Sequence, residues 1–186
     1  MCGRFALRSS SDELARQFGL AGVPLFEPND DIAPSARVLA VRADGAALLR
    51  WGLKGKMHNV RGETAAGKFG RAYAAGRCLV PANAFYEWKR VGTGKQPFFV
   101  RPARGELFAF AGLWERGECA VLTVEANETL RPIHHRMPAI IANDDYARWL
   151  GGEGGLLVPA ADSAVVAEPL TSKIDATGRS GSLFGD

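Results

Sequence analysis

Short apolar runs separated by turn residues dominate this chain and restrict it to folds that are rich in β-strands. The runs occupy residues 38–41, 46–49, 78–81, 85–88, 97–100, 107–113 and 120–124. Asp44-Gly45 separates the first two runs and predicts a hairpin, and glycines at positions 92 and 94 follow the fourth run. Runs of this length with turn residues between them are typical of antiparallel strands.

Two segments have a helical pattern instead. Residues 11–18 predict a short amphipathic helix, because Ser10 or Ser11 can cap it, acids lie in the first turn and Gly19 ends it. Residues 144–150 predict a second helix, which Gly151 ends. Residues 54–76 predict a functional loop with one helical turn. Together these patterns predict an α+β fold, a single and mainly antiparallel β domain with a few short flanking helices.

Composition places the chain among globular proteins. Hydrophobic residues make up 47% and charged residues 23% of the 186 residues, which excludes a disordered or collagen-like chain. No apolar run approaches the ~18 residues of a membrane helix, and the first residues lack a signal region, so we expect a cytoplasmic protein. Three cysteines without metal-ligand spacing predict reduced thiols, no metal and no cofactor.

Basic residues are concentrated before residue 151. There, 21 bases stand against 15 acids, and 17 of the 23 basic residues of the chain are arginines. Arginine suits phosphate recognition because its planar guanidinium donates two parallel hydrogen bonds. This charge pattern fits either a nucleic-acid surface or an ordinary solvated surface.

Cys2 becomes the first residue when Met1 is removed, and a small second residue favours that removal. The freed α-amine and the thiol titrate near pH ~8 and ~8.5, so both are partly reactive at neutral pH. Such an aminothiol condenses with an aldehyde to an imine, which the thiol closes to a thiazolidine. It can instead act as an N-terminal nucleophile. The alternative is an ordinary cysteine that is buried or inert.

Three polar residues alternate at positions 59, 61 and 63, and one carboxylate lies inside an aromatic run. On an extended segment Asn59, Arg61 and Glu63 share one face, although Arg61 and Glu63 could equally form a surface ion pair. If Glu87 faces inward, desolvation raises its pKa and suits it to proton transfer. If it faces outward, it is a solvated acid, and the pattern permits either interpretation.

His134 and His135 are adjacent, and Arg136 follows them. On an extended segment the two rings point in opposite directions, so at most one belongs to a given site. Adjacent histidines do not have the spacing of a metal pair. A single histidine that acts as an acid or base near a carboxylate is the better functional interpretation.

Basic and aromatic residues interleave in the same segments, as single-stranded DNA binding requires. The bases are Arg4, Arg61, Arg71, Arg77 and Arg136, and the aromatics are Trp51, Phe85 and Trp88. Cations contact phosphates, and aromatic faces stack on bases. The same aromatics also fit a hydrophobic core, where such residues are usually found.

Eight short motifs occur in order over residues 1–150. They are Met1-Cys2-Gly3-Arg4-Phe5, Ile32-Ala33-Pro34, Trp51-Gly52-Leu53, Asn59-x-Arg61-x-Glu63-Thr64, Arg77-Cys78-Leu79-Val80-Pro81-Ala82, Phe85-Tyr86-Glu87-Trp88-Lys89, Thr123-x-Glu125-Ala126-Asn127 and Ile133-His134-x-Arg136-Met137-Pro138. In this order they resemble the motifs of the SOS response-associated peptidase family. The resemblance implies a domain of twisted sheets or a barrel, with a catalytic core at 1–150. Residues 151–186 would form a shortened C-terminal part of the same domain with a loose end.

The resemblance implies a sensor and shield for abasic sites in single-stranded DNA, as at stalled replication forks. Cys2 would form a thiazolidine crosslink with the ring-opened sugar, and Asn59 would hold its amine. Glu87 would be the general acid and base, and His134 would help to open the sugar. The residues that would contact DNA are Arg4, Arg61, Trp51, Arg71, Arg77 and Arg136. Crosslink reversal, a strand-cleaving side activity, self-removal of Met1 and a monomeric state are also implied.

Two other classes of protein fit parts of the pattern. An N-terminal-nucleophile cysteine amidohydrolase can also begin Met-Cys-Gly, but residues 85–88 and 133–138 have no role there. A non-catalytic single-stranded DNA-binding module would use the same basic and aromatic residues and would tolerate Cys2→Ala. A glutaminase assay tests the first class, and a covalent product that depends on Cys2 excludes the second.

Overall fold

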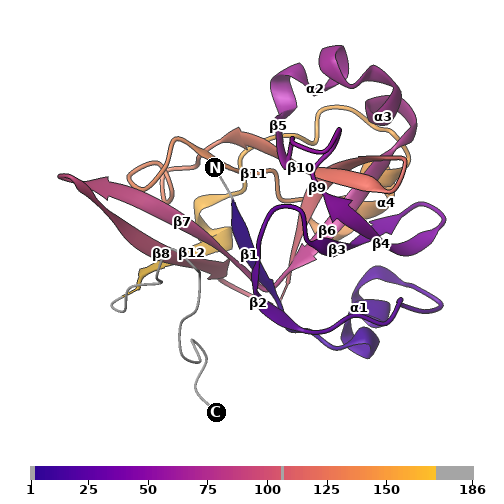
Figure 1. Ribbon diagram of the computed structural model, residues 1–186, viewed down its shortest axis with the longest axis horizontal. Coiled ribbons are helices and arrows are strands. Elements are labelled where there is room, and N and C mark those ends of the chain that lie inside the picture. Colours follow the sequence, from indigo (N-terminus) through magenta and orange to yellow (C-terminus); the bar gives the residue numbers. More distant parts are fainter. Residues whose placement is uncertain (1–2, 106, 171–186) are drawn as a thin grey trace.

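The computed structural model describes residues 3–105 and 107–170, which form two β-sheets with short helices beside them (Figure 1). The strands are β1 (Arg4–Leu7), β2 (Asn29–Ile32), β3 (Arg37–Arg42), β4 (Gly45–Trp51), β5 (Asn59–Arg61), β6 (Arg77–Ala82), β7 (Ala84–Val91), β8 (Gly94–Pro102), β9 (Phe108–Glu115), β10 (Glu118–Glu125), β11 (Arg136–Pro138) and β12 (Val165–Pro169). The helices are α1 (Ser11–Phe18), α2 (Gly62–Lys68), α3 (Gly70–Ala75) and α4 (Tyr146–Leu150), with 3₁₀ turns at Asn143–Asp145 and Asp162–Ala164. This architecture confirms the predicted α+β class and the single, mainly antiparallel β domain.

The smaller sheet has five antiparallel strands in the order β12-β8-β7-β1-β2. β1 lies beside β7, with Arg4 opposite Tyr86 and Phe5 opposite Phe85. The first described strand is therefore an inner strand of this sheet, and its register with β7 is fixed by these pairs.

The larger sheet has seven strands and closes on itself. Its order is β11-β10-β4-β3-β6-β9, with β5 beside β10, and β9 also pairs with β10. β10, β4, β3, β6 and β9 therefore form a closed ring, as expected for a barrel-like domain. Among the described residues, only the pairs that β10 makes with β4 and β5 are parallel.

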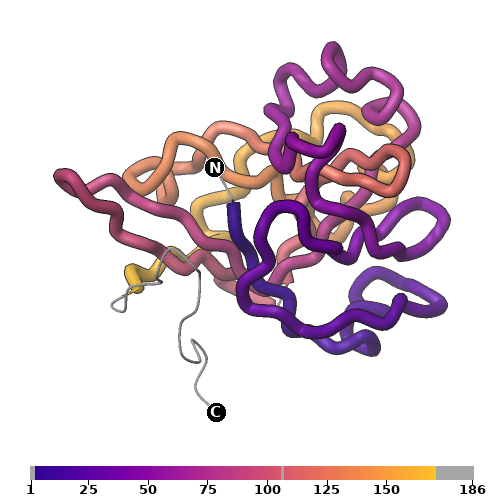
Figure 2. The backbone as a smooth tube through the Cα atoms, viewed as in Figure 1, coloured from indigo at the N-terminus to yellow at the C-terminus, as the bar shows by residue number. Residues whose placement is uncertain are grey.

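Aromatic side chains join the two sheets. Phe5 of the smaller sheet contacts Trp51 and Phe110 of the larger one, with ring centroids 5.0 and 6.1 Å apart. Phe85 contacts Phe110 at 5.8 Å. Only Asn83 separates β6 from β7, so the backbone passes from one sheet to the other without a loop (Figure 2).

The local sequence signals predicted helix α1 and the first hairpin correctly. Ser10 and Glu13 form a capping box at the start of α1, and Gly19 ends it in the left-handed conformation with φ 62°. β3 and β4 pair across Asp44-Gly45 as the turn signal indicates.

Three other segments differ from their predictions. Residues 54–76 contain two helices, α2 and α3, where the sequence predicted one helical turn. Residues 144–150 begin as a 3₁₀ turn and become helical only from Tyr146. Beyond residue 151, β12 pairs with β8 over residues 165–169, a strand that the sequence did not predict. None of the helices described at residues 3–105 and 107–170 has the length and apolar character needed to cross a bilayer.

Candidate active site

Strand register assigns polar residues to the face of the larger sheet that packs against the smaller one. Phe110 lies on this face because its ring contacts Phe5 and Phe85. Gly112 lies two residues after Phe110 on β9 and pairs with Val121 of β10. Val121 pairs in turn with Asn59 of β5. Paired residues and alternate residues point to the same side of a sheet. Asn59 therefore shares the face that carries Phe110.

The same register continues to the end of β10. Arg61 pairs with Thr123, and Thr123 pairs with Pro138 across β11. Arg136, two residues before Pro138, is on this face as well. The motif residues Asn59, Thr123 and Arg136 therefore lie on three adjacent strands, although they are far apart in the sequence.

Glu87 faces inward from the smaller sheet, so the structure resolves the choice that the sequence left open. It lies two residues after Phe85 on β7, on the side that packs against the larger sheet, and it is only 2% exposed. Burial raises the pKa of Glu87 above its ordinary value. Its neighbour Tyr86 points to the opposite side, where its hydroxyl donates to the Asp30 carbonyl at 2.9 Å.

The described chain begins beside this carboxyl. Arg4 is opposite Tyr86, so the antiparallel register brings Gly3 to the level of Glu87. Arg4 itself points to the outer side and pairs with Asp31. Cys2, the predicted nucleophile, and Met1 lie outside the described residues.

Arg136 is buried and is held by partners from two other elements. Its guanidinium donates to both carboxylate oxygens of Glu63, at 2.6 and 2.8 Å, and to the Thr123 carbonyl at 2.5 Å. These hydrogen bonds lower the pKa of Glu63. The prediction that Asn59, Arg61 and Glu63 share an extended face was wrong, because helix α2 begins at Gly62. Within the described structure Glu63 pairs with Arg136 and not with Arg61.

His134 is half-buried at the turn before β11. The Arg136 backbone N–H donates to His134 Nδ1 at 3.0 Å, which orients the ring. Burial lowers the pKa of His134, so the neutral imidazole is favoured. The rings of His134 and His135 stack with centroids 4.4 Å apart. The prediction that they point in opposite directions was wrong, because they lie in a turn and not on a strand.

A basic hollow of about 350 Å³ lies next to these residues. Its lining residues are Arg61, Glu125, Ala126, Arg131, His135 and Arg136. Arg136 is paired with Glu63 and Arg131 with Glu128, so Arg61 carries the lining charge that is most available to an anionic ligand such as a phosphate group. The arginines at 61 and 136 were predicted to contact DNA, and both line this hollow.

Trp51 and Arg77 occupy structural positions, which corrects the expectation that they face DNA. Trp51 is 0% exposed, and its indole N–H donates to the His58 carbonyl at 2.8 Å. Arg77 is buried over the rings of Tyr73 and Trp149, with its guanidinium carbon 4.5 and 4.4 Å from the ring centroids. Trp51 therefore has no surface open to a nucleic acid, and the guanidinium of Arg77, which is 6% exposed, is committed to ring contacts and backbone carbonyls.

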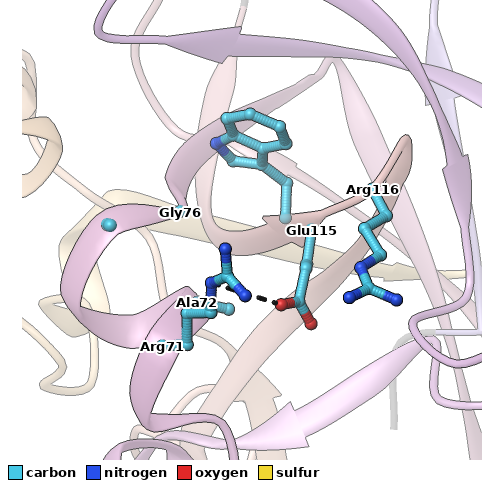
Figure 3. A pocket seen from close by; sticks show the side chains of 7 residues that line it. Arg71, Ala72, Gly76, Glu115 and Arg116 are labelled. Carbon is cyan, nitrogen blue, oxygen red and sulfur yellow. Dashed lines mark ion pairs between the residues drawn. The ribbon is translucent and has the colours of Figure 1, made fainter.

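Arg71 lies on α3, away from the basic hollow. It lines a separate hollow of about 240 Å³ with Trp114 and Arg116, and its guanidinium points toward Glu115 at 3.9 Å (Figure 3). This hollow adjoins the start of β10, whereas the basic hollow adjoins its end. At ~3.3 Å per residue, the eight residues of β10 separate the two by roughly 23 Å.

Four residues of the site had no predicted role in it. They are Glu63 as the partner of Arg136, Thr123, Arg131 and His135. Thr123 could have been suspected, because it is a polar residue within the apolar run at 120–124. The pairing of Glu63 with Arg136 has no local signal, since 73 positions separate the two residues.

Known proteins match this chain over most of its length. The family model described as SOS response associated peptidase (SRAP) matches residues 1–176. The abasic site processing protein YoaM of Bacillus subtilis is 37% identical over 179 residues, which cover 81% of this chain and 79% of that protein. The abasic site processing protein YedK of Escherichia coli is 29% identical over 181 residues, which cover 82% and 81%. A crystal structure of a Bacteroides thetaiotaomicron protein has a TM-score of 0.85 at 19% identity and covers 96% of this chain and 97% of its own.

Proposed function

Since the chain belongs to the SOS response associated peptidase family, we propose that it processes abasic sites in single-stranded DNA through a covalent bond to Cys2. The names of its relatives supply the substrate class. The observation that carries the proposal is the buried carboxyl of Glu87, which faces the other sheet at the point where the described chain begins. An abasic sugar is mostly a closed hemiacetal, and an acid must open it before an amine can attack.

The chemistry begins once Met1 is removed, by the protein itself or by another enzyme. The α-amine of Cys2 adds to the aldehyde of the opened sugar, and loss of one water gives the imine. The thiol then adds to the imine carbon, and its proton passes to the imine nitrogen. The product is a thiazolidine, one water lighter than the two reactants. Ring closure removes the imine, which would otherwise lead to strand cleavage by β-elimination.

Glu87 supplies the proton in this scheme. Burial raises its pKa, so the carboxyl retains its proton to a higher pH than a solvated glutamate. The acid protonates the ring oxygen of the hemiacetal and frees the aldehyde. The resulting carboxylate then accepts a proton when the amine attacks.

Asn59 and His134 complete the catalytic set. Asn59 shares the face opposite Glu87, and its carboxamide is suited to hold the amine of Cys2 by a hydrogen bond. His134 is oriented by the Arg136 backbone and favours the neutral form, so it can hydrogen-bond to the sugar or accept a proton from it. Arg61 and Arg136, which line the basic hollow, would bind the phosphates next to the abasic sugar.

The test is a crosslinking gel with intact mass analysis. Processed protein is mixed with a single-stranded oligonucleotide that contains one abasic site, and undamaged DNA and Cys2→Ala serve as controls. We expect a heat-stable adduct, absent from both controls, whose mass is one water below the sum. Loss of Met1 without any adduct would refute the proposal. Noncovalent binding that Cys2→Ala preserves would then indicate a DNA-binding module, and glutaminase activity would indicate an amidohydrolase.

A further inference from the structure

The hairpin of β7 and β8 extends beyond the rest of its sheet. β1 pairs with β7 only at residues 84–86, and β12 pairs with β8 only at residues 98–102. Among the described strands, residues 89–96 therefore have no strand partner except one another, and the tip projects from the body of the molecule (Figure 1). We call residues 89–96 the basic arm. Every residue from Arg90 to Lys95 is exposed.

The basic arm carries three cations and no acid. They are Lys89, Arg90 and Lys95, and no acidic residue occurs between Glu87 and position 106 of the sequence. Arg90 lies directly opposite Lys95 in the hairpin register. Like charges in this position destabilise a hairpin. The arrangement therefore carries an energetic cost in the free protein that a bound anion would relieve.

Other cations of the same sheet have acidic partners. Arg4 pairs with Asp31, and Arg101 donates to Glu168 at 2.8 Å. Within residues 3–105 and 107–170, the three cations of the basic arm form no ion pair. The other cations of this sheet are therefore neutralised by ion pairs, whereas the cations of the basic arm keep their positive charge.

The basic arm is a direct continuation of the strand that carries Glu87. At ~3.3 Å per residue, Lys89 is roughly 7 Å and Arg90 roughly 10 Å beyond Glu87 along β7. Phosphates of one strand follow each other every ~3.4 Å along a stacked B-form helix and lie farther apart in an extended single strand. The cations of the arm are therefore at the level of phosphates about one to three nucleotides from a sugar placed at Glu87.

We propose that the basic arm is a second DNA contact, which binds backbone phosphates about one to three nucleotides from the abasic site. This inference rests on the proposed function, because it takes the position of the sugar from Glu87. A two-stranded ribbon with cations on both strands can follow a phosphate backbone without reading its sequence. The arm therefore increases the affinity for DNA and fixes the position of the DNA strand along the protein. It takes no part in the covalent step.

The experiment compares two triple variants of the full chain that lose the same charge. In the arm variant, Lys89, Arg90 and Lys95 are changed to Gln. In the control variant, three exposed arginines on other elements, Arg16, Arg37 and Arg116, are changed to Gln. Binding of each to undamaged single-stranded DNA is measured by fluorescence anisotropy over a range of salt concentrations. Crosslinking to abasic DNA is measured in parallel at saturating protein.

We expect the arm variant to bind DNA about tenfold more weakly than the wild type. The slope of its log K against log salt should be less steep by about two. The control variant should bind like the wild type, and all three proteins should crosslink to the same final yield. The melting temperature of the arm variant should equal or exceed that of the wild type, because the Arg90–Lys95 repulsion is removed. Equal affinities and slopes for the two variants, or a wild type that binds no DNA, would refute the proposal that the basic arm binds DNA. A wild type that binds DNA without crosslinking refutes the proposed reaction alone.

Discussion

Replacing Glu87 with glutamine tests the proton that this buried carboxyl is placed to carry. The side chain is 2% exposed, and glutamine has nearly the same shape, so the packing between the two sheets should survive. General acid catalysis typically contributes ~10² to 10⁴-fold in rate, or about 3 to 5 kcal/mol of barrier. We expect Glu87→Gln to slow single-turnover crosslinking within that range, at saturating protein and with the same abasic oligonucleotide.

The pH dependence provides an independent readout of the same variant. The acid form of Glu87 is the reactive one in ring opening, whereas the amine of Cys2 attacks as the free base, whose fraction grows toward pH ~8. The ratio of the wild-type rate to the Glu87→Gln rate isolates the acid, and it should fall as pH rises through the raised pKa of Glu87. A variant that crosslinks at the wild-type rate, or a ratio that does not change with pH, would refute the role of Glu87 as the acid.

Glu87→Gln should slow crosslinking but increase the free energy of unfolding. Burial raises the folded pKa of Glu87 above its unfolded value. The associated stability is therefore present below the unfolded pKa and lost as pH rises through the folded pKa. Glutamine bears no charge, so the variant should gain stability relative to the wild type across this window. Denaturant titrations at several pH values measure the difference. A slow variant that is also less stable at alkaline pH would indicate damaged packing.

Three further predictions follow from the core and from the site. Trp51→Ala should lower the free energy of unfolding by about 3 to 5 kcal/mol in a denaturant titration, because it leaves a cavity at a fully buried position. Trp51→Phe should fold and keep the wild-type affinity for DNA. Glu63→Gln should cost only about 1 kcal/mol, since Glu63 is half-exposed, and it should weaken DNA binding by releasing the guanidinium it holds. Because the pKa of Glu63 is lowered, the stability from this pair is present above its unfolded pKa and lost as pH falls through the folded one, a loss that Glu63→Gln should not show. Cys78 and Cys119 should react with an aromatic disulfide reagent only after unfolding, because burial raises the pKa of Cys78 well above its ordinary value and that of Cys119 to about 12. Fast labelling of either thiol in the native protein would contradict this.

The site depends on contacts between residues that are far apart in the chain. Arg136 takes its place from Glu63 and Thr123, and His134 takes its orientation from Arg136. A substitution at any of these positions therefore affects more than one candidate group. Double-mutant cycles on Glu63 and Arg136 would separate the stability of the pair from its effect on DNA binding.

Local patterns in the sequence were sufficient where neighbouring residues decide the structure. The capping box at Ser10, the glycine that ends α1, and the Asp-Gly turn between β3 and β4 act within a few residues of each other. The ordered motifs likewise indicated the family and the candidate residues, because residue type and spacing are properties of the chain itself.

Tertiary structure alone decided which candidates meet and which are buried. Alternation permits Glu87 to face either way, and only the packing of Phe85 on Phe110 turns it inward. Trp51 and Arg77 are of the residue types that contact DNA, yet Trp51 is fully buried and Arg77 is only 6% exposed. Strand register and burial arise from pairings across tens of residues, and a short window of sequence contains at most one partner of such a pair.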